Sequence, residues 1–226
     1  MLVELKKSLS KAQLLAYKKD LTSHWRVEQN KRYRWLTLDA TVQSVMDRKN
    51  TDLLTFPHQF PLKGLIAELT EHASVLELGL GGGGNFRYLK SQCPTAEVDI
   101  VEQSPIVIEW FNEYFNPQSL IANIMQADAQ QYILDNEKRY DLIITDLFVS
   151  QSSILETLTA DYFTKLKQSL THTGFAYINF LPETDFEAHW VKASLEQAGL
   201  NVMWAEKIIG FRNWVYLISA RFQPST

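Results

Sequence analysis

The sequence predicts an α/β protein in which a seven-stranded, mostly parallel sheet is covered by helices on both faces. Three observations support this fold class. Segments with strand and helix character alternate along one continuous length of chain, residues 74–199. A run of glycines, residues 81–84, joins the first strand of that series to its first helix. Two strand-like segments with a tight turn between them follow the series, residues 200–222. Strict alternation of this kind is typical of parallel sheets with right-handed crossovers.

The first part of the chain, residues 1–60, is expected to form an appendage to a main domain at residues 61–226. Leucines mixed with lysines between residues 2 and 15 favour an amphipathic helix, packed on the body or on a partner subunit rather than on a membrane surface. Aromatic and β-branched residues alternate with polar ones over residues 33–47. This pattern predicts two short strands joined by a turn near Asp39.

The main domain begins with helical apolar spacing after Pro61 and then alternates strand and helix. One helix has its boundary marked in the sequence, because Ser104 can cap it and Pro105 suits its first position. The expected parallel strands cover residues 74–80, 96–103, 122–128, 140–148 and 174–181, and the expected helices cover residues 85–92, 104–115, 129–136, 159–170 and 185–199. An antiparallel hairpin at residues 200–222 brings the total to seven strands.

The overall composition is that of a soluble globular protein. The chain has 226 residues, 46% of them hydrophobic and 21% charged, with a net charge of -4. Nucleic acid is not an expected partner, because binding phosphates requires a clustered surplus of Lys and Arg. The single cysteine, Cys93, suits the reducing cytoplasm. We expect no secretory signal, no membrane span and no metal site, because the corresponding patterns are missing from the sequence.

The glycine-rich loop in "VLELGLGGGG" predicts a nucleotide site, because it follows a strand and opens a helix. It is not a P-loop, since no Lys-Ser or Lys-Thr pair follows the glycines. Residues 79–84 do satisfy the Gly-x-Gly-x-x-Gly pattern of nicotinamide dinucleotide enzymes. Glu77, however, lies two residues before Gly79 and gives acid-x-Gly-x-Gly-x-Gly, the form typical of enzymes that bind S-adenosylmethionine.

Two further acids end the next two strands. Glu102 is placed to accept hydrogen bonds from both ribose hydroxyls. Asp128 is placed to accept from an adenine amino group, or else it caps the helix that follows. Strand ends of an open α/β sheet meet at one crevice, so these acids are predicted to lie together. The candidate cofactor-binding residues are Glu77, Gly79, Gly81, Gly82, Gly83, Glu102, Gln103, Asp128 and Ala129.

Asp146 is the candidate catalytic residue. It follows four residues, "LIIT", of a predicted buried strand, so it is expected at the mouth of the same crevice. A carboxylate there can orient an attacking amine and take up its proton. The alternative is that Asp146 is a loop acid or a helix cap. His58 precedes the glycine-loop domain and either faces the site or lies on the surface.

Residues 38–174 resemble the spermidine synthases, the aminopropyltransferases of polyamine biosynthesis, and more distantly the class I S-adenosylmethionine methyltransferases. The motifs that carry the resemblance are "LDATVQSV", "VLELGLGGGGNFR", "VDIVEQS", "ADA" and "YDLIITDLF". The resemblance implies a Rossmann-like methyltransferase sheet with an N-terminal β-appendage of the kind often used in dimerisation, so a homodimer is one expectation. It also implies that Glu102 holds the ribose, Asp128 the adenine and Asp146 the attacking amine.

The chain departs from this family at two acids. Spermidine synthases carry an Asp at the position of Gly82, which holds the amino group of the aminopropyl chain, and a second Asp at the position of Val149. Polyamines are at least dications, and removing them from water without matching carboxylates is costly. Meanwhile Glu77, at a position that is usually apolar in the synthases, restores the methyltransferase form of the loop.

Three hypotheses about function therefore stand together. The first is a transferase that uses S-adenosylmethionine or its decarboxylated form and moves an aminopropyl group to a small-molecule amine. The second is a methyltransferase that acts on another small-molecule acceptor through the same cofactor pocket. The third is a non-catalytic nucleoside-binding protein derived from such enzymes.

Overall fold

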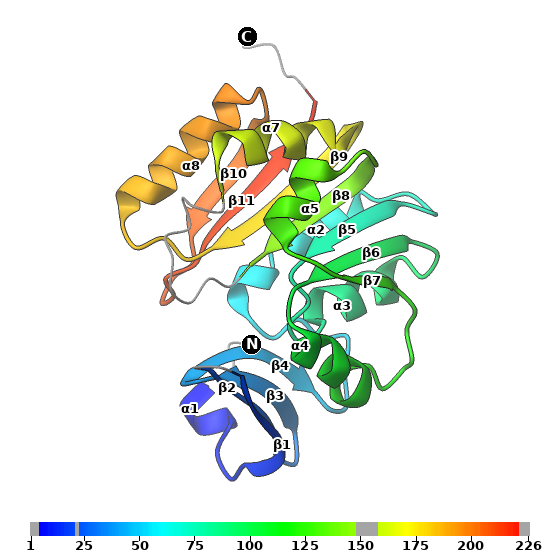
Figure 1. Cartoon of the computed structure of the whole chain (residues 1–226), viewed down its shortest axis with the longest axis vertical. Coiled ribbons are helices and arrows are strands. Elements are labelled where there is room, and N and C mark those ends of the chain that lie inside the picture. Colours follow the sequence, from blue (N-terminus) through cyan, green and yellow to red (C-terminus); the bar gives the residue numbers. More distant parts are fainter. Residues whose placement is uncertain (1–4, 21–22, 148–157, 222–226) are drawn as a thin grey trace.

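The computed structural model describes residues 5–20, 23–147 and 158–221, so Val149 lies outside the described residues. Two sheets organise these residues (Figure 1). A four-stranded antiparallel sheet is formed near the N-terminus, and a seven-stranded, mostly parallel sheet carries helices on both faces. The predicted α/β fold class and its C-terminal antiparallel hairpin are confirmed.

The N-terminal sheet has the strand order β1-β2-β3-β4, and each strand is antiparallel to its neighbours. The two strands expected on either side of Asp39 are confirmed as β3 and β4. Asp39 makes the turn with a φ of 52°, in the left-handed region that Asp tolerates better than most residues. The bounds are α1 (Leu5–Ser8), β1 (Gln13–Asp20), β2 (Ser23–Gln29), β3 (Tyr33–Leu38) and β4 (Thr41–Asp47).

The amphipathic helix expected over the first residues is wrong beyond its short start. Helix α1 ends at Ser8, and residues 13–20 form the edge strand β1, paired with β2. Helix propensity is a weak preference that tertiary contacts override, and pairing with β2 satisfies the backbone of this segment. The apolar side chains of Leu14 and Tyr17 remain more than half exposed, so they do not supply the packed stripe that a surface helix would need.

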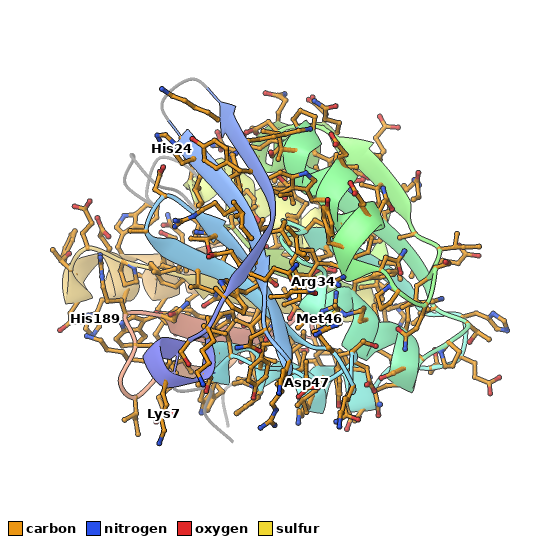
Figure 2. The ribbon with its side chains drawn as sticks, turned by 90° about the horizontal axis from the view of Figure 1, so that it is seen from below. Lys7, His24, Arg34, Met46, Asp47 and His189 are labelled. Carbon is orange, nitrogen blue, oxygen red and sulfur yellow. The ribbon has the colours of Figure 1, made fainter. Side chains whose placement is uncertain are left out.

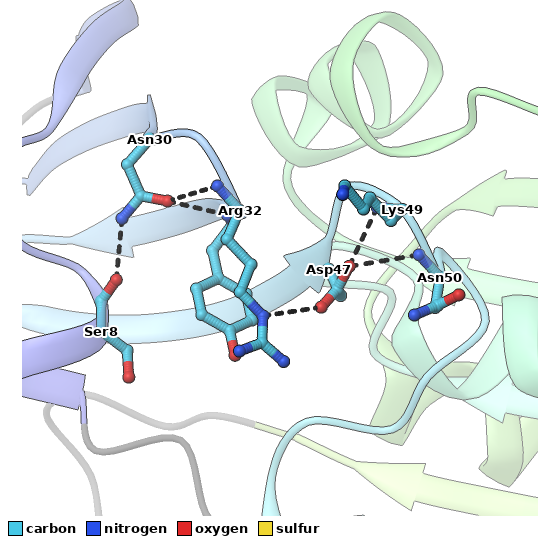
Figure 3. Close-up of polar contacts among 7 residues, drawn as sticks. Ser8, Asn30, Arg32, Asp47, Lys49 and Asn50 are labelled. Carbon is cyan, nitrogen blue, oxygen red and sulfur yellow. Dashed lines mark hydrogen bonds and ion pairs between the residues drawn. The ribbon is translucent and has the colours of Figure 1, made fainter.

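Asp47, at the end of β4, holds the chain where it leaves the N-terminal sheet (Figure 3). One carboxylate oxygen, Oδ1, accepts hydrogen bonds from the backbone N–H of Lys49 (2.9 Å) and Asn50 (3.2 Å). The other, Oδ2, accepts from Arg32 Nε at 3.2 Å. Burial alone would raise the pKa of Asp47, but these donors outweigh burial and lower it.

The larger sheet has the strand order β10-β11-β9-β8-β5-β6-β7. Strands β5 to β9 are parallel, and β11 pairs antiparallel with both β9 and β10. The predicted alternation of strands and helices is confirmed element by element. The bounds are η1 (Pro57–Gln59), α2 (Leu62–Ala67), β5 (Ser74–Leu78), α3 (Gly84–Gln92), β6 (Glu97–Glu102), α4 (Pro105–Trp110), the π-helical turn η2 (Phe111–Phe115), β7 (Asn123–Gln126), α5 (Ala129–Asp135), β8 (Tyr140–Asp146), α7 (Ala160–Gln168), β9 (Leu170–Phe180), α8 (Asp185–Gln197), β10 (Asn201–Lys207) and β11 (Trp214–Ser219).

The buried apolar side chains form one cluster on each face of the larger sheet. Helices α2, α3 and α4 pack on one face, and α5, α7 and α8 pack on the other. Successive strand residues alternate between them: Leu142 and Ile144 belong to the first cluster, whereas Ile143 belongs to the second. This double coverage explains why the central strands β5 and β8 are apolar at successive positions of the sequence.

One face of the N-terminal sheet belongs to the first of these clusters. Val27, Leu36 and Met46 are buried there together with side chains of the larger sheet and its helices. Arg34 adds a hydrogen bond of 2.5 Å from its Nη1 to the backbone oxygen of Tyr114 (Figure 2). The two sheets therefore share a core. Across the described residues, no helix has the length and apolar character to cross a membrane.

Candidate functional site

A cleft of about 1100 Å³ lies between the carboxyl ends of the parallel strands and the N-terminal sheet. Its first wall consists of the glycine loop and the ends of β6, β8 and β9. Its second wall is one face of the N-terminal sheet together with the segment around η1. Open α/β sheets bind ligands at this end of their strands, so the cleft is the candidate functional site.

The glycine loop connects β5 to α3 and forms part of the first wall. Gly79 has a φ of 91°, and a Cβ atom there would collide with the backbone carbonyl of Asp146. A Cβ at Gly82 would lie 2.6 Å from Ser44 Oγ. Glycine is therefore needed at residue 79 so that β5 and β8 can end side by side, and at residue 82 so that β4 can approach the loop.

The other loop glycines differ in their position. Gly81 lines the cleft, and a Cβ atom there would only touch Ser44 Cβ, at 4.0 Å. Gly83 does not line the cleft. A Cβ atom there would collide with the ring of Phe111, so glycine at this position serves internal packing. Some of the glycines thus serve internal packing, while the others leave backbone facing the cleft.

Glu102, at the end of β6, lines the cleft with its neighbour Gln103. Its carboxylate accepts hydrogen bonds from the backbone N–H of Leu80 (3.1 Å) and of Ser104 (2.8 Å). These bonds hold the acid against the glycine loop rather than in bulk solvent. Glu102 is thereby placed where a ribose beside the loop would meet it.

Asp128 has both of the positions that the sequence left open. Its Oδ1 accepts from the backbone N–H of Gln131 at 2.8 Å, which caps helix α5. Asp128 and Ala129 also line the cleft. The capping bond engages Oδ1, and a carboxylate has acceptor capacity on both oxygens, so Asp128 can cap α5 and contact a ligand at the same time.

Asp146 lies in the cleft at the end of β8, held by a chain of buried amides. Asn179 Nδ2 donates to Oδ1 at 2.6 Å, and Asn85 Nδ2 donates to Oδ2 at 3.1 Å. Behind them, Asn213 Nδ2 donates to Asn179 Oδ1 at 2.8 Å, and Gln59 Nε2 donates to Asn85 Oδ1 at 2.9 Å. Every amide in this chain directs its donor toward the carboxylate of Asp146.

Glu77 is separated from the cleft, unlike the other predicted acids. Only 1% of it is exposed, it does not line the cleft, and its Oε2 has no hydrogen-bond partner among the described residues. Burial, and then the charge of Asp146, raise the pKa of Glu77 to about 8, although Asn85 and Arg87 oppose the shift. Glu77 is therefore mostly protonated at neutral pH, and the structure places it behind the loop.

Arg87 is the buried cation next to Glu77. It donates from Nε to the backbone oxygen of Thr51 (2.5 Å) and from Nη1 to those of Gly82 and Phe115. Burial lowers the pKa of Arg87 to about 10, in spite of the neighbouring Glu77. Arg87 thus holds the glycine loop from the protein interior, through its hydrogen bond to the backbone oxygen of Gly82.

His58 lines the cleft, so of its two predicted positions the one facing the site is observed. Its ring stacks on Phe56 with 5.3 Å between the centroids. Tyr177 donates its hydroxyl to the backbone oxygen of His58 at 2.6 Å and thereby fixes the segment. Burial lowers the pKa of His58, and the charge of Asp146 only partly offsets this, so a neutral imidazole faces the cleft.

The sequence reasoning missed the amides around Asp146. Asn179 had a detectable signal, because it ends the strand next to β8 and pairs in register with Asp146. Gln59, Asn85 and Asn213 come from three other elements or loops and carry no motif. Within the described residues, no group of three or more His, Cys, Asp or Glu side chains is arranged to hold a metal ion.

Comparison with known proteins gives three consistent findings about this chain. A family described as a methyltransferase domain matches residues 75–174, which contain the glycine loop, Glu102, Asp128 and Asp146. The polyamine aminopropyltransferase of Chromobacterium violaceum is 25% identical over 142 residues, which cover 62% of this chain and 54% of that protein. The polyamine aminopropyltransferase of Vibrio vulnificus is 32% identical over 110 residues, 46% of this chain and 36% of that protein.

A solved structure shares the fold over most of the chain. The probable spermidine synthase from Corynebacterium glutamicum superimposes with a TM-score of 0.77 and 16% identity, covering 92% of this chain and 80% of that one. The chain is therefore similar to aminopropyltransferases in sequence and to a probable spermidine synthase in fold, and these relatives are transferases. It spans only about half, or about a third, of the length of the two curated relatives.

Proposed function

We propose that this protein is a group transferase that binds S-adenosylmethionine or its decarboxylated form and transfers an aminopropyl group to a small-molecule amine. One observation carries the proposal: the glycine loop, Glu102 and the amide-held Asp146 line one cleft. The sequence similarity to polyamine aminopropyltransferases supports the same reaction class.

The residues present fit an adenosyl compound. The cleft volume of about 1100 Å³ is large enough for a nucleoside and an acceptor together. Backbone at Gly81 faces it without a side chain in the way, and Glu102 and Asp128 stand at neighbouring strand ends. Glu102 would hold the ribose hydroxyls, and Asp128 with Ala129 would lie beside the base.

The chemistry requires a nucleophile and a group that manages its proton. The cofactor supplies an electrophilic carbon beside a sulfonium sulfur. An amine attacks such a carbon through its lone pair, so it must be unprotonated at that moment. Asp146 accepts one amide donor on each oxygen, which leaves lone pairs free to orient the amine N–H and to take up its proton. The neutral His58 is a second proton acceptor in the same cleft.

The test of this proposal is the variant Asp146→Asn. We expect transfer to fall by roughly a hundredfold or more, because a carboxylate that accepts a proton is replaced by an amide. The affinity for methylthioadenosine, measured by calorimetry, should stay within about threefold of the wild-type value. The control is Asp135→Asn, which changes an exposed acid on α5 outside the cleft. Unchanged turnover in Asp146→Asn would contradict the catalytic role, and a wild-type protein that binds methylthioadenosine but never turns over would favour the non-catalytic alternative.

Methyl transfer is the second candidate, and Gly82 is the observation that favours it. An acid at this position, which would bind an aminopropyl amino group, has no room beside Ser44 without a shift of β4. The two reactions leave different nucleosides, because aminopropyl transfer releases methylthioadenosine whereas methyl transfer releases S-adenosylhomocysteine. Mass analysis of the nucleoside product therefore distinguishes them with any acceptor that reacts.

A further inference from the structure

The second wall of the cleft holds polar side chains that the proposed chemistry does not use. Arg26 on β2 and Thr37 on β3 are paired in register, so they project from the same face of the N-terminal sheet. Gln43 lies at the register shift in β4, between Val42, which pairs with Thr37, and Ser44, which pairs with Leu36. All three residues line the cleft.

Each of these residues has a buried polar atom without a partner. Arg26 Nε, Thr37 Oγ1 and Gln43 Nε2 make no hydrogen bond within the described part of the chain. Thr37 is only 4% exposed, so its hydroxyl is removed from bulk water. Buried polar atoms without partners are rare in native proteins and call for an explanation, such as a bound group. Three donors on one face of a cleft indicate a ligand that carries acceptor oxygens.

The distribution of charge narrows the kind of ligand. Arg26 is the one Lys or Arg among the described residues that line the cleft, and no ion pair of Arg26 occurs among those residues. Arg26 Nη2 donates to the backbone oxygen of Asp39 at 2.7 Å, which holds the guanidinium beside the turn. Because a backbone oxygen carries no net charge, this bond does not neutralise the guanidinium. The part of the cleft next to this guanidinium therefore favours an anionic group of a ligand over an ammonium group.

The four acids that line the cleft are, in contrast, already engaged. Glu28 accepts from Trp35 Nε1 at 3.1 Å, and Glu102, Asp128 and Asp146 accept the donors described above. Each of these carboxylates therefore already has a donor on at least one of its oxygens, although it keeps its charge. The polar atoms left over in the cleft are therefore mainly donors, located on the N-terminal sheet.

We propose that Arg26 and Thr37, with Gln43 beside them, form a subsite that binds a carboxylate of the ligand. The inference rests on the proposed function, because it takes the cleft to hold an adenosyl compound and an amine. A guanidinium and a hydroxyl are well suited to bind a carboxylate through charge-assisted hydrogen bonds. The carboxylate belongs either to the cofactor, as in S-adenosylmethionine, or to an acceptor that is an amino acid rather than a plain polyamine.

The experiment compares ligands that differ only in a carboxylate. The variants are Arg26→Gln and Thr37→Val, and the control is Arg48→Gln, because Arg48 also donates to one backbone oxygen but lies outside the cleft lining. In the first arm, calorimetry measures the binding of S-adenosylmethionine, its decarboxylated form and methylthioadenosine. In the second, protein saturated with methylthioadenosine is titrated with ornithine and with putrescine, which is ornithine without its carboxylate.

The two arms separate the two sources of the carboxylate. If it belongs to the cofactor, both variants should lose at least about tenfold in affinity for S-adenosylmethionine and keep their affinity for the other two nucleosides. If it belongs to the acceptor, wild type should prefer ornithine over putrescine by about tenfold or more, and both variants should lose that preference. Thr37→Val keeps the shape of the side chain, so it tests the subsite even if Arg26→Gln unfolds.

The outcome that overturns the subsite is also defined. If both variants keep every ratio of carboxylated to decarboxylated ligand within twofold of wild type, Arg26 and Thr37 do not bind a carboxylate. If the cleft is not an adenosyl site, the result is different, because wild type would then not bind methylthioadenosine at all. A protein that binds methylthioadenosine but shows no turnover loses the proposed reaction, and the subsite is still tested by the binding ratios.

Discussion

At the scale of single residues, the site contains two neighbouring acids, Asp146 and Glu77, with different surroundings. Asp146 receives two amide donors and lies in the cleft, whereas Glu77 is buried behind it with an oxygen that lacks a hydrogen-bond partner in the described structure. Two carboxylates so close to each other do not both ionise easily. Burial, and then the charge of Asp146, raise the pKa of Glu77, so Glu77 is the acid that keeps its proton.

This arrangement predicts how stability depends on pH. The pKa of Glu77 rises from 4.5 to about 8 on folding, so the folded state binds a proton that the unfolded state loses between these values. The contribution of Glu77 to the free energy of unfolding should therefore be fully present below about pH 4.5 and be lost as the pH rises toward 8. In Glu77→Gln this loss, on the order of 2 to 4 kcal/mol, should disappear.

Urea unfolding at pH 5, 6.5 and 8 measures the effect. The comparison is between the slopes of the free energy of unfolding against pH. A destabilisation by the buried amide that is the same at every pH therefore does not affect the comparison. Glu97→Gln, at the exposed start of β6, should keep the wild-type slope. Parallel pH profiles of wild type and Glu77→Gln would mean that Glu77 is ionised in the folded protein.

At the scale of elements, the turn after β4 connects the two sheets and depends on one side chain. Asp47→Asn keeps an oxygen for the N–H groups of Lys49 and Asn50 but removes the charge and turns an NH2 group toward Arg32. We expect a loss of roughly 1 to 3 kcal/mol at pH 7, because Asp47 is buried and each of its bonds is charge-assisted.

The same variant gives a second pH signature. The pKa of Asp47 is lowered in the folded state, so its stabilisation is present above its unfolded pKa and is lost as the pH falls through the folded value. The difference in melting temperature between wild type and Asp47→Asn should therefore shrink under strongly acidic conditions. Asp135→Asn is again the control, and a difference that persists unchanged at low pH would exclude the charge as its cause.

Most of the elements could be predicted from the sequence, and the exceptions have physical reasons. Strands β5 and β8 are buried at successive positions because both faces of the sheet are covered there, and Ser104 caps α4 as expected. Strands β1 and β2 were both missed, because neither has a strict alternation of apolar and polar residues, and their pairing with each other and with β3 decides their state.

The site was predictable only where a motif carries it. Glu102, Asp128 and Asp146 follow strands, so their place at one sheet edge followed from the order of the elements. Asn85, Asn213 and Gln59 converge from separate segments, and nothing local marks them. The pairing of Arg26 with Thr37 depends on the register of β2 and β3, which the sequence does not specify. The boundary near residue 60 and the homodimer stay predictions.

At the scale of the whole molecule, the shared core predicts that both sheets unfold together. Met46 is 2% exposed and belongs to the cluster that joins the N-terminal sheet to the larger one. Met46→Ala should cost about 2 to 5 kcal/mol through lost burial and a cavity, while thermal unfolding stays a single transition. Calorimetry and circular dichroism should report the same midpoint.

The matched control for this prediction is Met203→Ala. Met203 is 45% exposed on β10, so its truncation should change stability by no more than about 0.5 kcal/mol. Two separate transitions in Met46→Ala, with the first confined to the N-terminal sheet, would show that the sheets are independent folding units.

The two faces of the N-terminal sheet have a consequence for how such a protein changes over generations. Arg26 and Val27 are adjacent in the chain, yet Val27 is buried in the shared core and Arg26 lines the cleft. A substitution at one of these two neighbouring positions therefore changes the packing of the core, whereas a substitution at the other changes the lining of the cleft. Substitutions at the cleft-lining positions of β2 can therefore change the second wall while the ends of the parallel strands, encoded far downstream, are left intact.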